Sequence, residues 1–154
     1  MPTIAIPLQD LILDPETDPK PGAEAGIQLS NAFAFLGPVT VSVEGDLVHI
    51  TLPDPPAQQR DEALRTYARA VRLAEQGKQR QTVPLFEKVL EVLPAHTDAR
   101  RNLAMAHLES GDPEKAKELL VQTLRLDPRD AWACLLLGNI HTQAGNVDLA
   151  MQLF

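Results

Sequence analysis

Histidine and cysteine are the residue types in this chain that could bind a metal, so their spacing is considered first. The chain has 154 residues, with four histidines and one cysteine. His107 and His141 could form a metal pair, but zinc needs three or four ligands and no further ligand is spaced near them. His49 and His96 have no companions either. The sequence therefore predicts no metal site and no cofactor.

Nucleophilic side chains are equally isolated. Cys134 lies in the apolar stretch 132–140, whereas a reactive thiol needs an electropositive and partly exposed setting, so we interpret it as a packing residue. The serines, Ser30, Ser42 and Ser110, occupy no nucleophile motif. The chain also has no glycine-rich loop that could hold a phosphate group. We therefore expect a protein without catalytic activity.

Composition restricts the class of partner. With 44% hydrophobic and 23% charged residues, the chain is of the globular kind. Nucleic acid is not an expected partner, because the net charge is −7 and no cluster of Lys and Arg is available for phosphate contacts. The first ten residues lack the pattern of a signal peptide, and no run approaches the ~18 apolar residues of a membrane span. We expect a soluble cytoplasmic protein without membrane contact.

Charge and proline content both change near residue 60. Residues 1–60 hold eight acids and two bases, a net charge of −6, whereas residues 61–154 hold thirteen acids and twelve bases, a net charge of −1. Nine of the thirteen prolines also precede Arg60. This shift predicts an N-terminal segment over 1–56 and a second region over 57–154.

Short apolar runs at 4–8 and 11–13 predict one or two extended pieces near the N-terminus. These runs are more apolar than a solvated tail, so we expect them to pack against another part of the molecule. Residues 23–36 carry apolar side chains at helical spacing, which predicts a short amphipathic helix.

Strict alternation of apolar and polar residues predicts a β-hairpin over 39–52. Its two alternating runs, 39–43 and 47–52, flank a turn at 44–46. A lone two-stranded hairpin is marginal in water, so this one needs a partner surface. The candidates are the preceding helix, the terminal strands, the second region and another copy of the chain.

Glycines, prolines and large apolar residues recur in the second region at a fixed interval. They are the glycines 77, 111 and 145, the prolines 94 and 128, and the large apolar residues Phe86, Leu120 and Phe154. A fixed period of roughly 34 residues indicates a stack of similar supersecondary units.

Each unit has the pattern of two helices and two tight turns. Residues 97–109 have no internal Gly or Pro, and residues 113–125 carry apolar residues at helical spacing. Between them, Asp112 is a favourable N-cap and Pro113 suits the first helical position. In the first unit we expect helices over 61–75 and from Thr82, which would place Pro84 in a first helical turn.

The residues in these units closely resemble the tetratricopeptide repeat. The best copy fills the signature positions with Leu137, Gly138, His141, Gly145, Ala150 and Phe154. The copy before it has Leu103, Ala104, His107, Gly111, Ala116, Leu120 and Pro128. The most degenerate copy has Arg69, Ala70 and Thr82 but keeps Gly77, Phe86 and Pro94. In this interpretation His107 and His141 fill the aromatic position of their repeats.

The resemblance covers 63–154 and implies a mainly α fold. We expect a helical repeat array, or α-solenoid, with repeats at about 63–96, 97–130 and 131–154, the last incomplete, preceded by a small segment with a β-hairpin. Members of this family bind peptides or helices on the concave face that the first helix of each repeat lines. The lining would be Leu64, Tyr67, Ala68, Val71, Asp98, Arg101, Asn102, Met105, Trp132, Leu135, Leu136 and Asn139.

The resemblance therefore implies a protein interaction scaffold that binds another protein or a peptide in an apolar groove. The predicted ligand contacts are Tyr67, Val71, Arg101, Asn102, Met105, Trp132, Leu136 and Asn139. A subset of the family binds C-terminal carboxylates through Lys, Asn and Arg. Only Asn102 matches that clamp, since Tyr67, Val71, Trp132 and Leu136 stand at its other positions. We expect a different class of ligand.

Two alternatives remain at this point. The chain could be a self-association module, in which the hairpin and the uncapped C-terminal helix are buried between copies of a homo-oligomer. It could also be the regulatory part of a larger enzyme, truncated at Phe154.

Overall fold

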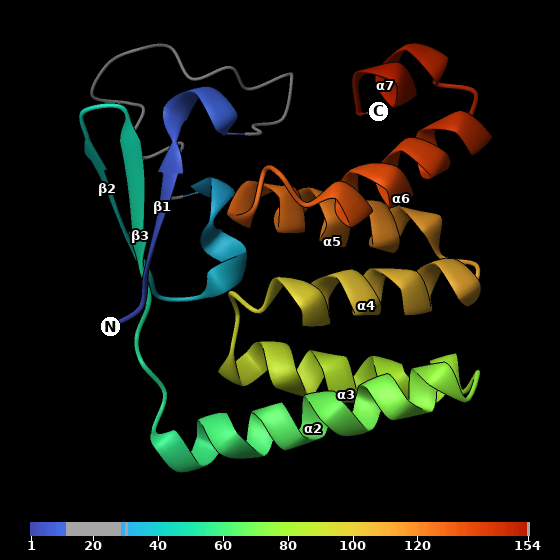
Figure 1. Ribbon diagram of the computed structural model, residues 1–154, viewed down its shortest axis with the longest axis horizontal. Helices are drawn as coiled ribbons and strands as arrows, with labels where there is room; N and C mark the ends of the chain where they lie inside the picture. Colours follow the sequence, from blue (N-terminus) through green and yellow to red (C-terminus); the bar gives the residue numbers. More distant parts are fainter. Residues whose placement is uncertain (12–28, 30, 154) are drawn as a thin grey trace.

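The computed structural model describes residues 1–11, 29 and 31–153. A small sheet lies beside the ends of a stack of helices, as Figure 1 shows. The sheet consists of β1 (Thr3–Pro7), β2 (Thr40–Glu44) and β3 (Leu47–Thr51), with short 3₁₀ turns η1 (Leu8–Asp10) and η2 (Ala34–Leu36). The predicted helix over 23–36 lies largely outside the described residues, and its described part ends in η2.

The predicted hairpin is confirmed, and β1 completes it as a three-stranded antiparallel sheet in the order β1-β3-β2. Gly45 has a φ of 59° and is the first central residue of a two-residue turn, the position where a type II′ hairpin favours glycine. In the register, Val48 lies opposite both Ile6 and Val43. One face of the sheet is therefore aliphatic across all three strands.

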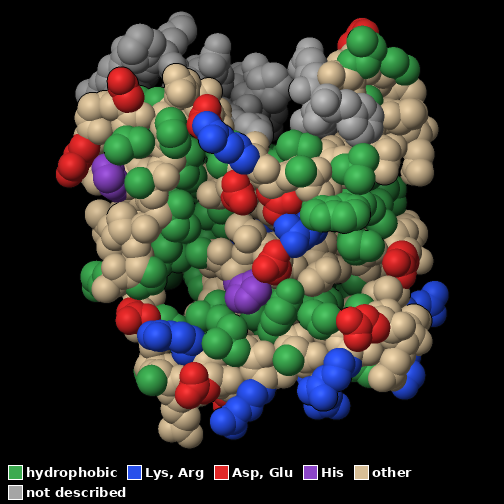
Figure 2. All heavy atoms as spheres, viewed as in Figure 1, with side chains coloured by type: hydrophobic (Ala, Val, Ile, Leu, Met, Phe, Trp, Pro, Cys, Tyr) green, Lys and Arg blue, Asp and Glu red, His purple; other side chains and the backbone are tan. Residues whose placement is uncertain are grey.

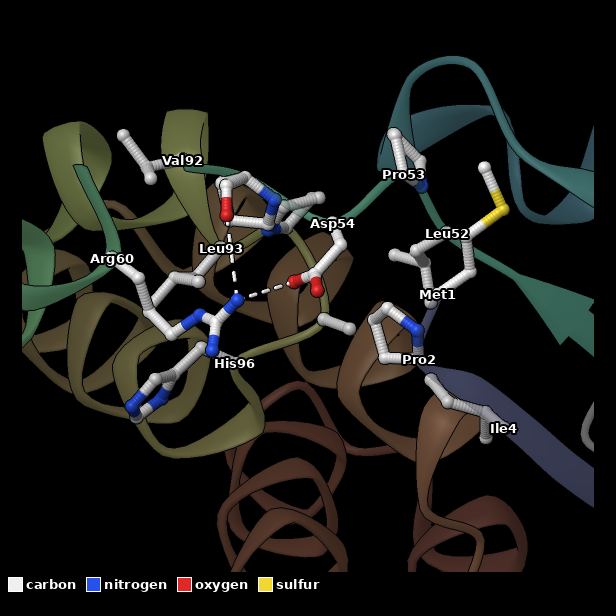
Figure 3. A pocket seen from close by; sticks show the side chains of 13 residues that line it. Met1, Pro2, Ile4, Leu52, Pro53, Asp54, Arg60, Val92, Leu93 and His96 are labelled. Carbon is white, nitrogen blue, oxygen red and sulfur yellow. Dashed lines mark hydrogen bonds and ion pairs between the residues drawn. The ribbon is translucent and has the colours of Figure 1, made fainter. Parts of the chain in front are cut away.

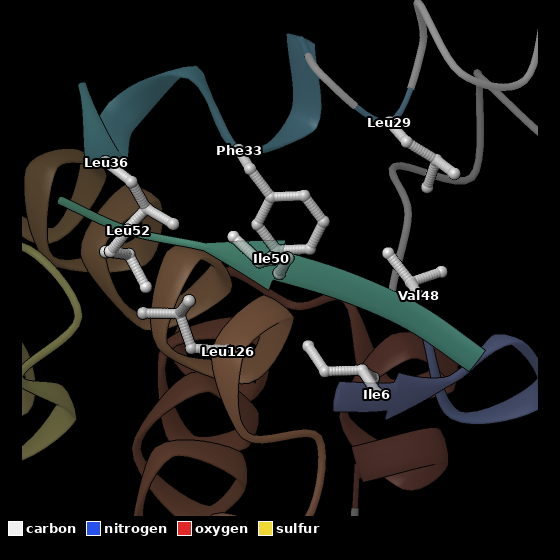
Figure 4. Close-up of a cluster of buried hydrophobic side chains, with 8 residues drawn as sticks. All are labelled: Ile6, Leu29, Phe33, Leu36, Val48, Ile50, Leu52 and Leu126. Atoms are coloured by element: carbon white, nitrogen blue, oxygen red, sulfur yellow. The ribbon is translucent and has the colours of Figure 1, made fainter. Parts of the chain in front are cut away.

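A hydrophobic core joins this aliphatic face to the helical stack (Figure 4). Leu29, Phe33 and Leu36 come from the segment before β2, and Leu126 comes from the end of a stack helix. Figure 4 shows Phe33 directed toward Ile50 of β3. The hairpin thus has three of its predicted partner surfaces, namely the preceding segment, the terminal strand and the repeat region.

Three arginines reinforce this junction. Arg100 is only 4% exposed, and its guanidinium lies 4.5 Å from the ring centroid of Phe35. It also donates hydrogen bonds to Gln122 Oε1, at 2.6 Å, and to the carbonyl of Pro94. Burial lowers the pKa of Arg100 to about 10.

The other two arginines reach residues of the N-terminal segment. Arg125 donates to the carbonyl of Ala32 at 3.2 Å, and Arg129 forms an ion pair with Asp10 at 3.2 Å. Arg129 is largely exposed, so its ion pair contributes little to the stability of the fold. The hydrogen bond of Arg125 is partly buried. These contacts make the segment a packed part of the molecule.

Six helices in the described residues form the stack. They are α2 (Ala57–Glu75), α3 (Gln79–Val92), α4 (Thr97–Glu109), α5 (Pro113–Leu126), α6 (Ala131–Gln143) and α7 (Val147–Leu153). Gly77, Gly111 and Gly145 follow the first helix of each pair and have φ values of 73°, 86° and 80°. Glycine adopts this left-handed conformation without steric cost, which explains its return after each first helix.

Two predicted helix starts were wrong. Helix α2 begins at Ala57, four residues before the predicted 61, because Ala and Gln continue the helix back to Pro56. Helix α3 begins at Gln79 and contains Pro84, so Thr82 is not its N-cap. Thr82 is buried instead, and its hydroxyl donates to the carbonyl of Gln79 at 2.7 Å. The proline removes one backbone donor near the helix start and leaves the rest of the ladder intact.

Truncating Leu126 tests whether the sheet and the array share a core. We expect Leu126→Ala to lower the free energy of unfolding by about 2–5 kcal/mol, because it leaves a cavity beneath β3. The measurement is urea denaturation followed by circular dichroism. Met151→Ala is the control, because this side chain is 71% exposed. Its loss should change stability by no more than about 0.5 kcal/mol. Equal effects of the two substitutions would contradict the shared core.

Candidate functional site

Four positions recur on each of α2, α4 and α6, the first helices of the three pairs. We call the surface that they occupy the first-helix face. Its residues are Leu64, Asp98 and Trp132, then Tyr67, Arg101 and Leu135, then Ala68, Asn102 and Leu136, and lastly Val71, Met105 and Asn139. In Figure 2, acidic, basic and histidine side chains cross the centre of the molecule, beside hydrophobic ones.

Large apolar side chains are exposed on this face. Leu64, Met105, Trp132 and Leu135 have exposed fractions between 38% and 63%, and Trp132 is the most exposed of the four. Helices α3 and α5, which the structure describes throughout, have no large hydrophobic residue exposed to this degree. In the first two pairs this exposure is therefore confined to the first helix, whereas in the third pair α7 also exposes Val147 and Met151.

Arg101 occupies the centre of the face and is already paired. Its guanidinium donates to the carboxylates of Asp98, one turn earlier on α4, and Asp130. Asp130 is buried and also accepts a hydrogen bond from the backbone N–H of Ala133 at 2.9 Å, which caps α6. Arg101 thus connects α4 to the start of α6, and its charge is neutralised within the protein.

Tyr67 and Asn102 form a second contact across the face. The Asn102 amide donates to the Tyr67 hydroxyl at 3.4 Å, which joins α2 to α4. The Tyr67 ring lies 6.1 Å from that of Phe86 and 4.6 Å from that of His96, measured between centroids. Burial, followed by the charge of Asp98, raises the pKa of Tyr67, so the phenol stays protonated and available as a donor.

His96 lies beside this face, against Tyr67, and is a structural residue that the sequence interpretation left without a role. Its Nδ1 accepts a hydrogen bond from the backbone N–H of Ala99 at 3.1 Å and so caps α4. This bond requires Nδ1 to be unprotonated. Burial lowers the pKa of His96, while the nearby Asp98 carboxylate acts in the opposite direction. The sequence signal for this capping role was the position of His96 immediately before Thr97, at the predicted start of a helix.

The remaining predicted contacts differ in accessibility. Val71 and Leu136 are half-buried and pack against the helical cores, whereas Asn139 is exposed. Cys134 is half-buried against the same core as Leu136, and burial raises the pKa of its thiol. Among the described residues no group of three or more His, Cys, Asp or Glu side chains is placed to hold a metal ion.

A cleft of about 620 Å³ lies between the start of β1 and the turn from α3 to α4, and His96 separates it from Tyr67 of the first-helix face. Figure 3 shows Met1, Pro2 and Ile4 on one side and Arg60 and His96 on the other. The Arg60 guanidinium in this cleft already has hydrogen-bond acceptors, because it donates to Asp54 Oδ1 at 2.6 Å and to the Pro55 carbonyl at 3.3 Å. The sequence did not predict this cleft, which depends on contacts between distant segments.

The cap at His96 predicts a dependence of stability on pH. Because the folded-state pKa of His96 is below its usual value of about 6.5, the unfolded chain binds this proton more tightly. Its contribution to stability is therefore complete above pH ~6.5 and is lost as the pH falls toward the folded-state pKa.

His96→Asn provides the test, because asparagine keeps an oxygen acceptor at the N-cap and does not titrate. We expect the free energy of unfolding to fall less steeply from pH 7 to pH 5 in this variant than in the original chain. Urea denaturation at each pH measures both curves. Parallel curves would show that His96 does not couple to folding.

Comparison with known proteins gives a family and a fold. The family model described as tetratricopeptide repeat matches residues 73–125 and 107–154. The protein CTR9 homolog of Arabidopsis thaliana is 39% identical over 64 residues, which are 42% of this chain and 6% of that protein. The chain thus spans a small fraction of this relative's length.

Two kinds of solved structure share the fold. The second repeat domain of Spaghetti (RPAP3), bound to the HSP90 peptide SRMEEVD, has a TM-score of 0.59 at 24% identity, over 63% of this chain and 90% of that one. MamA from Desulfovibrio magneticus RS-1, residues 41 to the end, has a TM-score of 0.55 at 20% identity, over 90% of this chain and 73% of that one. Among the described residues no helix is long and apolar enough to span a membrane. The pairs of helices with their glycine turns, and a family match over more than half of the residues, show that the chain belongs to the tetratricopeptide repeat family.

Proposed function

We propose that this chain is a non-catalytic adaptor whose first-helix face binds a peptide of another protein, as an amphipathic helix or an apolar strand. The observation that carries the proposal is the exposure of Leu64, Met105, Trp132 and Leu135 on that one face. Tetratricopeptide folds generally serve as protein interaction modules, and the Spaghetti (RPAP3) domain of the same fold has a bound peptide.

The chemistry of the exposed side chains favours an apolar ligand. Trp132 offers a large, rigid surface with one hydrogen-bond donor, as interface anchors commonly do. Met105 is flexible and polarisable, so it can adapt to ligands of different shape. A helical ligand would present its own apolar residues at i, i+3, i+4 and i+7 to these side chains.

The polar residues at the centre of the face serve mainly to fix its shape. Arg101 is neutralised by Asp98 and Asp130, and Asn102 is hydrogen-bonded to Tyr67. A ligand carboxylate would have to displace these partners and leave them unpaired, which is costly. The face therefore offers apolar area with few free charges.

Selection from a displayed library of random peptides tests the proposal. Trp132 is the one tryptophan in the chain, so a shift of its emission to shorter wavelength reports directly on coverage of the face. We expect enriched peptides to produce this shift and to bind Trp132→Ala and Met105→Ala at least ~10-fold more weakly, since anchors of this kind each contribute more than about 1.4 kcal/mol.

Val147→Ala and Met151→Ala are the matched controls, because these residues are exposed apolar side chains on α7, outside the face. The enriched peptides should bind both controls with unchanged affinity. Peptides that lose affinity for the α7 variants and keep it for the face variants would refute the proposal.

The peptide SRMEEVD tests the class of ligand. We expect it to bind more weakly than ~1 mM. Its free-acid and C-terminally amidated forms should not differ, because the clamp positions hold Tyr67, Val71, Trp132 and Leu136. Titration with Trp132 fluorescence and calorimetry would measure both forms. Micromolar binding that amidation abolishes would instead make the chain a carboxylate-binding adaptor.

A further inference from the structure

Within the part of the chain that the structure describes, strand β2 forms an open edge of the sheet. The strand order β1-β3-β2 leaves each outer strand with one partner, and no described residue pairs with the far side of β2. Figure 1 shows β2 on the side of the sheet away from the helices. Strand edges in natural proteins are commonly blocked by Lys, Pro or a bulge. The sequence of β2, TVSVE, has neither Lys nor Pro and carries its one charge, Glu44, at the end of the strand; its pairing with β3 is regular throughout.

The hairpin register defines which backbone groups point outward. In a two-residue hairpin the residues that flank the turn, here Glu44 and Leu47, exchange both backbone hydrogen bonds. Ser42 and Thr40, two and four residues earlier, therefore also direct their N–H and C=O groups toward β3. By alternation, Val41 and Val43 direct their N–H and C=O groups to the open edge.

The aliphatic face of the sheet is also unfinished at this edge. Val41 and Val43 lie on the same face as Ile50 and Val48, their partners in β3, which are fully buried. Val43, by contrast, is 43% exposed. An added strand would both pair the backbone groups and cover this side chain.

We propose that the added strand is β2 of a second copy, paired antiparallel about Ser42, so that two sheets become one sheet of six strands. In this register Val41 of each copy lies opposite Val43 of the other. Both residues have outward-facing backbone groups, so the pairing forms four hydrogen bonds and a two-fold symmetric interface. The interface lies outside the first-helix face and does not depend on the function proposed for it.

The strand is complementary to itself in this register. All five residues of each strand are paired, and the aliphatic side chains of the two copies meet on one face. Each Glu44 lies opposite Thr40 of the other copy, and the two Glu44 residues stand about 14 Å apart along the sheet. Like charges are therefore separated, whereas centring the pair on Val43 would bring them closer.

Ser42 gives a direct test because it would lie opposite its own copy on the symmetry axis. As a non-hydrogen-bonded pair, the two Ser42 Cα atoms would be about 4.5 Å apart, which is within the range of a disulfide. In a Cys134→Ala background, we expect Ser42→Cys to form a disulfide-linked dimer in a glutathione redox buffer. Glu44→Cys is the matched control, since it is two residues away on the same exposed face but too distant from its copy to link.

Sedimentation velocity across a range of concentrations supplies the independent measurement. The original chain should show a mass twice that of the 16.9 kDa monomer at high concentration. Val43→Lys should remain monomeric, because two lysines would enter the interface while the bonds between β2 and β3 are kept.

Three results would overturn the proposal. A monomer at every concentration would show that the edge does not self-associate and is open to a foreign strand. A dimer that persists in Val43→Lys, without cross-linking at Ser42→Cys, would place the interface elsewhere. Equal cross-linking of the Ser42→Cys and Glu44→Cys variants would indicate random collisions.

Discussion

Close approach of helices at small buried residues is the constraint on which the rest of the structure depends. Ala70, Ala104 and Gly138 occupy equivalent positions on the three first helices, and Thr82, Ala116 and Ala150 do so on the second helices; all six are buried. A side chain of larger volume at these positions would force the helices apart, because protein interiors are close-packed. Once one side of each first helix is fixed in this way, the helical period places the first-helix face at the margin of the core, where Tyr67, Val71 and Leu136 still pack against it.

Two adjacent arginines on α4 have different surroundings in this close-packed array. Arg100 and Arg101 are adjacent on α4 and therefore point to different sides of it. Arg101 meets carboxylates, whereas Arg100 is buried among neutral acceptors and the ring of Phe35, without a carboxylate partner among the described residues. A buried cation is costly unless its donors are satisfied, and those of Arg100 are satisfied only in part. The array supplies two acceptors and the N-terminal segment supplies the ring of Phe35, while Arg100 Nε has no hydrogen-bond partner among the described residues. The ring of Phe35 is thus a further contact between the N-terminal segment and the array.

Local signals made most of the helical region predictable from sequence. Helix α4 has the predicted bounds, and α5 differs by one residue, because Asp112, Pro113 and Gly111 mark their ends chemically. The start of α3 was predicted incorrectly because a proline in the second turn is tolerated when the surrounding helix is held by packing. Pairing of β1 with β3 joins residues 40 to 48 positions apart, and no local pattern encodes that choice.

The candidate site stays a prediction, but the structure shows which of its contacts the sequence could and could not indicate. The resemblance to the tetratricopeptide repeat implied the twelve positions of the first-helix face, and the exposure of Trp132 and Met105 is compatible with contact to a ligand. Pairing of Arg101 with Asp130 and capping by His96 could not be predicted, because each depends on the approach of a neighbouring turn. Periodicity specifies which residues share a face, whereas their partners depend on tertiary packing.

The two proposed surfaces would act together through symmetry. Pairing about Ser42 relates the two arrays by a two-fold axis and leaves a first-helix face on each copy. A partner with two suitable segments could then bind both faces, and its second segment would bind at the effective concentration set by the linker between the segments. Two weak apolar contacts would in that case give tight binding without a buried charge at either site. The pairing strand lies at the sheet edge remote from the helices, so dimerisation would change the valence of the proposed adaptor and leave the chemistry of each face unaltered.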